Sequence, residues 1–203
     1  MLDEKRYNEI VELTRSIQGW AHASSLVALY DLALQTPNGS MLVELGSWKG
    51  LSAAWMGTAL KDRGHGRLFA VDTWSGTTTE PGHAELLAGY GPDQLYQEFL
   101  GNMQRLGLQD TVVPIRSNTL SAARQWQHGT SISLLYIDAS HEYADVRADF
   151  EHWAPNVVDG GVIVFDDVPS WPGPTRLVTE LPSWYRWVRA TPNQGIVVKM
   201  PAR

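Results

Sequence analysis

Acidic side chains follow two apolar segments of the sequence, and a histidine lies close to the first of them. One apolar run leads into Asp138, with His141 three residues later, and a second run leads into Asp166 and Asp167. Short apolar runs of this kind predict buried strands, and neighbouring parallel strands would bring their ends to within about 5 Å. Three converging carboxylates repel one another unless protons or a cation neutralise them.

The chemistry that suits such a cluster is metal binding with a nearby base. Oxygen ligands favour a hard divalent ion, so Asp138, Asp166 and Asp167 are predicted ligands of Mg²⁺ or a similar cation. A neutral His141 beside a metal-bound hydroxyl could act as a general base. The alternatives are that Asp166 or Asp167 caps a turn and that His141 is a solvated loop residue.

A glycine-containing segment after an earlier apolar run suggests a loop that binds a ligand. Glu44 ends the run and is followed by Gly46, Ser47 and Gly50. Glycine directly after a strand allows a tight turn, and the helix that follows offers free N–H groups. Neither the G-x-G-x-x-G pattern nor the P-loop pattern is present. An ordinary strand–helix turn is the alternative interpretation.

Asp72 ends the next apolar run, 28 residues after Glu44. An acid at this place can accept hydrogen bonds from both hydroxyls of a ribose. It could equally cap a helix. Together with the glycine-containing segment, Asp72 favours a ligand that carries adenosine.

Composition excludes several classes of protein. The chain has 203 residues, no cysteine and a formal net charge of −6. Disulfides, thiolate metal sites and a cysteine nucleophile are therefore excluded, and a reducing compartment is indicated. The acidic balance makes nucleic acid a poor partner, and the longest charge-free apolar run, 132–137, is too short to cross a bilayer. The charged N-terminus does not suggest a signal peptide, so we expect a cytoplasmic protein with no membrane partner.

The pattern of apolar residues predicts an α/β fold. Within residues 1–36, two amphipathic helices are expected over 3–18 and 22–35, and Ile10, Leu13 and Ile17 form the apolar face of the first. Strands that alternate with helices follow. Strands are expected near 41–45, 68–72, 111–115, 132–138, 162–165 (begun by Gly160-Gly161), 184–190 and 195–200. The helices expected between them include one of small residues at 52–60 and one at 143–153. The last two are too close in sequence for a parallel crossover and should be antiparallel. We expect a single domain over 1–203, with residues 75–91 as a long loop and candidate lid.

Several stretches taken together resemble class I S-adenosylmethionine-dependent methyltransferases, which are Rossmann-like. The closer resemblance is to the metal-dependent, macrocin-type O-methyltransferases that act on sugars of macrolides and other natural products. The stretches are Val43-Glu44-Leu45-Gly46-Ser47-Trp48-Lys49-Gly50, Val71-Asp72-Thr73-Trp74, Ile137-Asp138-Ala139-Ser140-His141-Glu142-Tyr143 with Asp149-Phe150, and Trp153-Ala154-Pro155 with Gly160-Gly161 and Asp166-Asp167. The resemblance implies a mostly parallel seven-stranded sheet that closes with an antiparallel strand pair.

The resemblance also implies roles for individual residues. Glu44, Gly46 and Ser47 would hold the methionine end of S-adenosylmethionine. Further contacts with the cofactor are implied for Asp72 at the ribose, Thr73, Trp74, Ser117 and Asn118 near the adenine, and Asp138. Asp138, Asp166 and Asp167 would bind Mg²⁺ or another hard divalent cation, and His141 would be the base.

Catechol-type and caffeoyl-CoA-type methyltransferases have a similar layout with two differences. They carry Lys at the position of His141 and Asn at the position of Asp167, so the sugar-type subgroup is the better match. The expected function is methyl transfer to a hydroxyl of a small-molecule acceptor. The acceptor would be selected by the N-terminal helices, the 75–91 loop and residues 168–184, which carry no readable motif.

Three alternatives remain open from the sequence. They are a metal-independent methyltransferase of the same fold, a nucleotide-binding oxidoreductase, and a binding module without catalysis. Trp74, Tyr90, Trp171 and Trp184 are candidates for apolar walls of the ligand pocket, or for ordinary packing. A homo-oligomer is neither indicated nor excluded.

Overall fold

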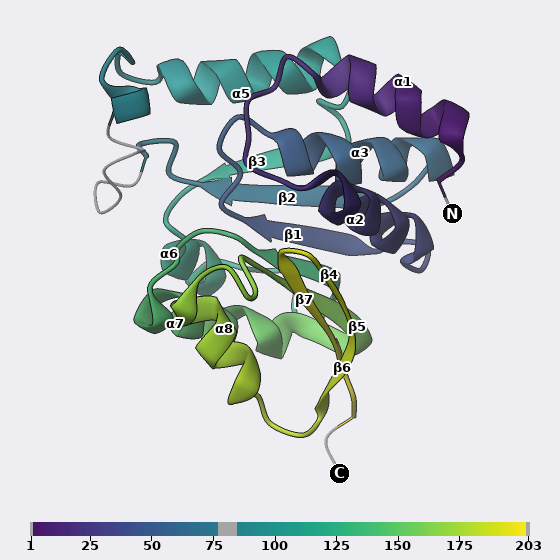
Figure 1. The fold of residues 1–203 in the computed structure, drawn as a ribbon, viewed down its shortest axis with the longest axis vertical. Helices are drawn as coiled ribbons and strands as arrows, with labels where there is room; N and C mark the ends of the chain where they lie inside the picture. Colours follow the sequence, from purple (N-terminus) through teal and green to yellow (C-terminus); the bar gives the residue numbers. More distant parts are fainter. Residues whose placement is uncertain (1, 77–84, 202–203) are drawn as a thin grey trace.

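A seven-stranded sheet with helices on both faces forms the centre of the molecule (Figure 1). The computed structural model describes residues 2–76 and 85–201. The strands are β1 (Met41–Leu45), β2 (Arg67–Asp72), β3 (Val112–Arg116), β4 (Ile132–Ile137), β5 (Val157–Asp166), β6 (Tyr185–Thr191) and β7 (Gln194–Lys199). The helices are α1 (Glu4–Thr14), α2 (Ala23–Gln35), α3 (Leu51–Arg63), α5 (Gln94–Arg105), α6 (Thr119–Arg124), α7 (Tyr143–Trp153), the 3₁₀ turn η1 (Ala154–Asn156) and α8 (Pro172–Thr179).

The order of the strands confirms the predicted fold class. The order across the sheet is β3-β2-β1-β4-β5-β7-β6. Strands β1 to β5 pair in parallel, whereas β7 is antiparallel to both β5 and β6. Strands β2 and β3 lie on one side of β1, and β4 and the strands that follow it lie on the other side. The strand order therefore reverses beside β1. Ligands of open α/β sheets bind at the carboxyl ends of the strands near such a reversal.

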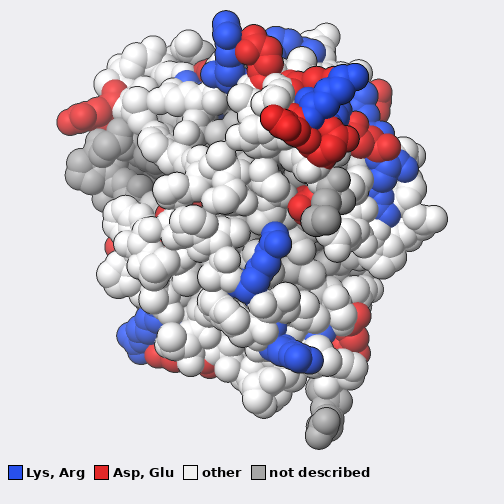
Figure 2. Space-filling view, turned by 45° about the vertical axis from the view of Figure 1, so that its right-hand side comes forward, with Lys and Arg blue, Asp and Glu red and all other residues white. Residues whose placement is uncertain are grey.

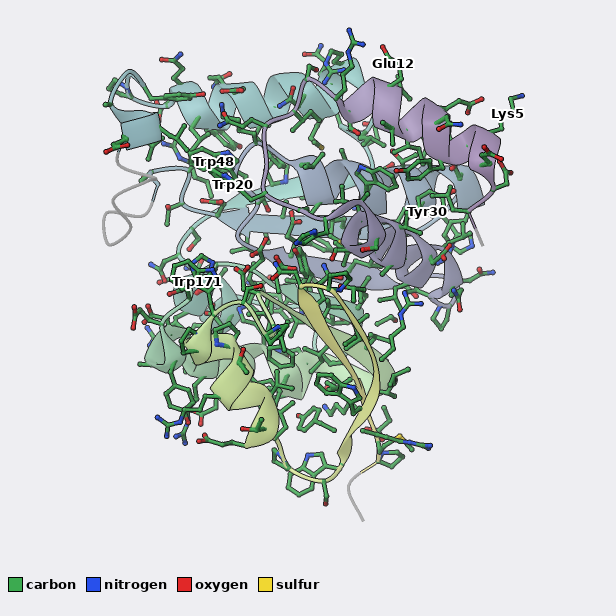
Figure 3. All side chains as sticks on the ribbon, in the orientation of Figure 1. Lys5, Glu12, Trp20, Tyr30, Trp48 and Trp171 are labelled. Atoms are coloured by element: carbon green, nitrogen blue, oxygen red, sulfur yellow. The ribbon has the colours of Figure 1, made fainter. Side chains whose placement is uncertain are left out.

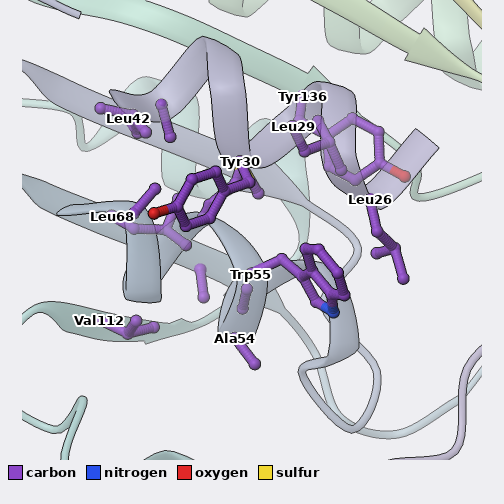
Figure 4. Packing of buried hydrophobic residues seen from close by; sticks show 14 of the residues in the cluster. Leu26, Leu29, Tyr30, Leu42, Ala54, Trp55, Leu68, Val112 and Tyr136 are labelled. Carbon is purple, nitrogen blue, oxygen red and sulfur yellow. The ribbon is translucent and has the colours of Figure 1, made fainter. Parts of the chain in front are cut away.

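The first hydrophobic core lies between the sheet and helices α1, α2, α3 and α5. Alternate strand residues, such as Leu42 and Leu68, point to this side because side chains alternate along a strand. Figure 4 shows them beside Tyr30 of α2, with Trp55 of α3 in the same cluster. Helix α3 is buried along most of its length, which explains its small residues and its weak amphipathic pattern.

The second core covers the opposite face of the sheet, under α6, α7 and α8. Val43 and Phe69, the neighbours in sequence of Leu42 and Leu68, point to this side. Trp153 of α7 is fully buried here. Both faces of the parallel strands are therefore covered, which fixes the register and leaves the strand ends as the accessible edge of the central sheet.

Two expectations from the sequence need correction, and a third lies partly outside the described residues. The first helix ends at Thr14, and Leu13, expected to be buried, has 46% of its surface exposed. After the helix the chain passes close to the start of α3, where an added Cβ on Gly19 would lie 2.9 Å from Leu51. Strand β5 begins at Val157, not at the glycines, which mark a register shift against β4. Residues 77–84 of the predicted 75–91 loop lie outside the described residues, and 85–87 are helical.

Charged side chains of both signs are interspersed on the face shown in Figure 2. Part of this arrangement is a set of ion pairs at α1, where Arg6 contacts Glu9 at 3.0 Å and Asp62 at 2.7 Å. Within residues 2–76 and 85–201, every helix is too short or too polar to span a bilayer.

Candidate active site

A cavity of about 910 Å³ lies at the carboxyl ends of the parallel strands. Its walls come from the loops after β1, β2, β3, β4 and β5, from the segment between α1 and α2, and from α7. In Figure 3, Trp20, Trp48 and Trp171 lie near this end of the sheet, whereas Lys5 and Tyr30 lie toward the other end. The volume is in the range of pockets that bind small molecules and cofactors.

Most of the residues singled out from the sequence line this one cavity. They are Gly46, Ser47, Asp72, Thr73, Ser117, Asn118, Asp138, His141, Asp166 and Asp167. They come from five separate segments, and the strand order brings them together. Glu44 and Trp74 are absent from the cavity walls formed by the described residues.

Glu44 lies beneath the glycine-containing loop and is fully buried. Its Oε2 accepts a hydrogen bond of 2.6 Å from the Ser47 hydroxyl. Burial raises the pKa of Glu44 to about 7. Its position therefore supports the loop from below and holds Ser47 at the cavity wall.

Gly46 is required by the close approach of two strand ends. Its φ is +86°, and an added Cβ would lie 2.2 Å from the carbonyl oxygen of Asp138. Only glycine adopts this conformation without strain and leaves room for the neighbouring backbone. The loop after β1 and the loop after β4 are thereby held in contact at the floor of the cavity.

The Asp72 carboxylate organises the same loop from the other side. Its Oδ2 accepts hydrogen bonds from the backbone N–H groups of Ser47 and Trp48, at 2.9 and 2.8 Å. Its Oδ1 accepts from the backbone N–H of Trp74 at 2.7 Å. Asp72 also lines the cavity. Because each carboxylate oxygen can accept two hydrogen bonds, Oδ1 retains capacity for a ligand hydroxyl.

Trp74 is a packing residue in this structure. Its side chain is 3% exposed and packs against Tyr96 and Phe99, with ring centroids 4.8 Å apart in each case. The indole N–H donates to the carbonyl oxygen of Trp48 at 2.8 Å. Of the four proposed apolar wall residues, Trp171 lines the cavity, and Trp184 lies at the opposite edge of the sheet, where β6 begins.

Ser117 and Asn118 form the wall that follows β3. The backbone N–H of Ser117 donates to the carbonyl oxygen of Asp72 at 2.9 Å, which ties this wall to the end of β2. The Asn118 side chain caps α6 by accepting from the backbone N–H of Ser121 at 2.8 Å. The two polar residues are thus fixed at the N-terminus of α6.

The three acidic residues predicted from the strand ends do converge. Each of Asp138, Asp166 and Asp167 offers an oxygen that lies within 4.8 Å of the others. Burial, together with the neighbouring negative charges, raises the pKa of Asp166 to about 7 and that of Asp138 well above its ordinary value. The cluster therefore favours a bound positive charge.

His141 is held against this cluster by two contacts. Its Nε2 lies 2.5 Å from Oδ2 of Asp167, and its ring stacks on Trp171 with centroids 4.2 Å apart and planes 10° apart. The Asn193 amide donates to the other oxygen, Oδ1 of Asp167, at 2.9 Å. Burial opposes ionisation of Asp167, but these two hydrogen bonds outweigh it and lower the pKa of Asp167.

Sequence reasoning gave no role to several residues that the fold brings to the cavity. The segment 18–21, with Trp20 at a centroid distance of 5.6 Å from Trp48, follows the first predicted helix and carries no motif. Asp149 lines the cavity from α7 although it is 3% exposed. A signal for Asp149 was present, because an acid falls among Val146, Phe150 and Trp153 on the apolar face of a predicted helix.

A family model described as "Methyltransferase domain" matches residues 43–168. Among curated proteins, uncharacterised protein y4gI of Sinorhizobium fredii (strain NBRC 101917 / NGR234) is 30% identical over 99 residues, which are 49% of this chain. The match spans about a tenth (10%) of the length of that relative.

Similar solved structures show the same fold at low identity. A protein of Corynebacterium glutamicum has a TM-score of 0.65 at 13% identity, with 100% of this chain and 93% of that chain covered. The O-methyltransferase TomG of Streptomyces achromogenes, involved in tomaymycin synthesis and solved with S-adenosylmethionine, has a TM-score of 0.64 at 17% identity (99% and 92%). The TDP-rhamnose 3'-O-methyltransferase CalS11 of calicheamicin biosynthesis has a TM-score of 0.59 at 16% identity (97% and 81%).

The family match covers well over half of the chain and includes the loops after β1, β2, β3, β4 and β5 that line the cavity. The chain therefore belongs to the methyltransferase-domain family and shares the fold of these solved O-methyltransferases.

Proposed function

We propose that the protein transfers a methyl group to a hydroxyl of a small natural-product or sugar acceptor, with His141 as the base. The observation that carries this proposal is the position of His141 in the cavity, between Asp167 and Trp171 and beside the other two carboxylates. A base at this place can take the proton that the acceptor hydroxyl loses as it is methylated. The cytoplasm is the proposed location, since a chain without cysteine suits a reducing compartment.

The cofactor fits the part of the cavity between the glycine-containing loop and α6. Ser47, Asp72 and Thr73 offer polar groups along one wall, with Ser117 and Asn118 beyond them. We assign the methionine end to the loop at Ser47 and the ribose to Asp72, whose Oδ1 can still accept a hydrogen bond. The sulfonium of S-adenosylmethionine is an activated methyl donor, so the residues of the cavity chiefly bind and orient.

The carboxylate cluster fits a hard divalent cation such as Mg²⁺. Oxygens of Asp138, Asp166 and Asp167 lie within 4.8 Å of one another, and two of the three groups resist ionisation without a compensating charge. A cation held there would lower the pKa of the acceptor hydroxyl and fix the position of its oxygen. The chain's own contribution is to hold His141 beside the cluster, in contact with Asp167 and stacked on Trp171.

A metal-independent reaction is a second candidate, and one observation favours it. Both oxygens of Asp167 already have hydrogen-bond partners, His141 on one side and Asn193 on the other. In this arrangement Asp167 orients the imidazole and stabilises its protonated form, as in other carboxylate–histidine pairs. His141 remains the base in both candidates, so the cation alone distinguishes them.

The cofactor assignment is tested by thermal unfolding with S-adenosylhomocysteine, using NAD as the parallel control. A ligand at one hundred times its Kd adds about 2.7 kcal/mol of stability, which corresponds to roughly 5–11 °C in midpoint for a domain of this size. A shift with S-adenosylhomocysteine alone supports the proposal. A shift with NAD alone would instead support a nucleotide-binding oxidoreductase.

The metal is tested with a panel of small hydroxyl compounds as acceptors, by following release of S-adenosylhomocysteine with Mg²⁺ and with a chelator. Loss of turnover in the chelator, restored by Mg²⁺, supports the metal-dependent reaction. In Asp166→Asn, more Mg²⁺ should be needed for half-maximal turnover, because one ligand charge is lost. Turnover that the chelator leaves unchanged would favour the carboxylate–histidine pair without a metal.

A further inference from the structure

Asp149 is a buried carboxylate in the cavity wall that the proposed reaction does not use. It lies on α7 and is 3% exposed, and its interaction with the Thr119 side chain partly offsets the effect of burial on its pKa. Burial raises its pKa to about 6, so the group is still mainly ionised at neutral pH. Within residues 2–76 and 85–201, no Lys or Arg forms an ion pair with it.

Burial of an anion without a positively charged partner costs free energy, so such a group needs hydrogen-bond donors. Beside Thr119, the neighbouring residues of the cavity wall are Leu120 and Ala148. This part of the cavity thus combines apolar walls with a strong acceptor. A flat heteroaromatic ring that carries an N–H donor would satisfy both features.

The position along the cavity separates Asp149 from the reacting groups. Helix α7 starts at Tyr143, two residues after His141, and Asp149 lies six residues further, about 9 Å along the helix axis. Its partner Thr119 follows the wall formed by Ser117 and Asn118. A nucleoside whose sulfur lies near His141 and whose ribose lies near Asp72 would extend its base toward this wall.

We infer that Asp149 accepts a hydrogen bond from the exocyclic amino group of the cofactor's adenine and so helps to select an adenosyl ligand. This inference rests on the proposed function, which places the nucleoside in this cavity. The carboxylate can only accept and the amino group donates, so the pairing is chemically complementary. The role is one of recognition, since Asp149 lies away from the acceptor hydroxyl and from His141.

The test compares two ligands that differ in this amino group alone. They are S-adenosylhomocysteine and its analogue with purine in place of adenine, which carries hydrogen where adenine carries the amino group. Calorimetry gives the dissociation constants of both for the wild-type protein. A hydrogen bond to a charged group predicts that the purine analogue binds at least about tenfold more weakly.

Asp149→Ala should reduce this preference to about twofold or less, because the acceptor is gone while the cavity walls remain. Asp145→Ala is the matched control, since Asp145 lies one turn earlier on α7 and also lines the cavity, but is exposed and bonded to Ser140. The control should keep the wild-type ratio. For each variant, the dissociation constants of the wild type and the variant for the two ligands form a four-membered cycle. This cycle separates the loss of the contact from general effects of the substitution.

Three results would overturn the inference while leaving the proposed function intact. They are equal affinity of the wild-type protein for both ligands, an unchanged ratio in Asp149→Ala, and loss of the ratio in Asp145→Ala. If Asp149→Ala does not fold, Asp149→Asn keeps the size of the side chain, and its neutral acceptor should give a ratio between those expected for wild type and alanine. Failure of both ligands to bind the wild-type protein would overturn the proposed function, and the inference with it.

Discussion

Replacement of Glu44 by Gln should remove a pH dependence of stability that one buried carboxyl group creates. Glu44 is fully buried under the glycine-containing loop, and burial raises its pKa from 4.5 to about 7. Well below pH 4.5 the group is protonated in both the folded and unfolded states. Well above pH 7 it is ionised in both, and the folded protein then carries the cost of the buried charge.

The sign and size of the effect follow from these two pKa values. Because the folded state binds the proton more tightly, Glu44 contributes stability at low pH that is lost as the pH rises toward and through 7. The full difference corresponds to about 3 kcal/mol, of which about 2.5 kcal/mol falls between about pH 5 and pH 8.5. No discount for solvent applies, since the side chain has no exposed surface.

The assay is urea unfolding of the wild type and of Glu44→Gln, each at about pH 5 and at about pH 8.5. From the lower to the higher pH, the free energy of unfolding of the variant should rise by about 2.5 kcal/mol relative to that of the wild type. Other titrating groups, such as Asp149 and Asp166, are present in both proteins and cancel in this double difference. In the variant, an amide oxygen replaces the carboxylate oxygen as acceptor for the Ser47 hydroxyl, and the cost of this exchange does not depend on pH.

A difference between the two proteins that stays constant within about 0.5 kcal/mol across this range would refute the reasoning. Glu44 would then titrate normally in the folded state. That outcome would mean that water or a cation reaches the carboxylate, so the floor of the cavity would be open rather than sealed. The role of Glu44 as a buried support for Ser47 would have to be abandoned.

The same contacts lead to expectations for three other side chains. His141→Ala should lower turnover by roughly 10²–10⁴-fold in the methyl-transfer assay while the affinity for S-adenosylhomocysteine stays unchanged; wild-type turnover would remove it from the reaction. Lys49→Met breaks a 3.1 Å ion pair with Glu98 and should cost about 1–3 kcal/mol by urea unfolding, less than for a fully buried pair because Glu98 is 36% exposed. An equal loss in the exposed control Lys5→Met would contradict this expectation. Trp55→Ala should cost about 3–5 kcal/mol by the same method, since the side chain is 1% exposed, and a loss below about 1 kcal/mol would show that the core repacks.

The order of elements could be predicted from the sequence because apolar periodicity is local. The run Met41–Leu45 and the run Arg67–Asp72 are strands as expected, with the helix of small residues between them. Boundaries were less predictable. Leu13 completes an apolar helical pattern with Ile10, yet 46% of its surface is exposed.

The acidic cluster could be predicted because it depends on only two facts, the ends of two strands and their adjacency. Once β4 and β5 pair in parallel, Asp138 and Asp166 must lie at the same edge. The stacking of Trp171 on His141 could not be predicted in this way. It depends on how the chain turns after β5, and the sequence between 167 and 172 carries no periodic signal for that turn.

The sequence by itself determined the α/β alternation, the antiparallel closing pair and the chemical types at the strand ends, since these follow from short-range patterns and from chain connectivity. Only the tertiary structure decided which side chains share the cavity. In the structure, Glu44 and Trp74 are buried behind the cavity wall. Trp20 and Asp149, to which the sequence pattern had assigned no role, line the cavity. The physical reason is that a side chain's environment is set by residues distant in sequence, whose packing the local pattern does not encode.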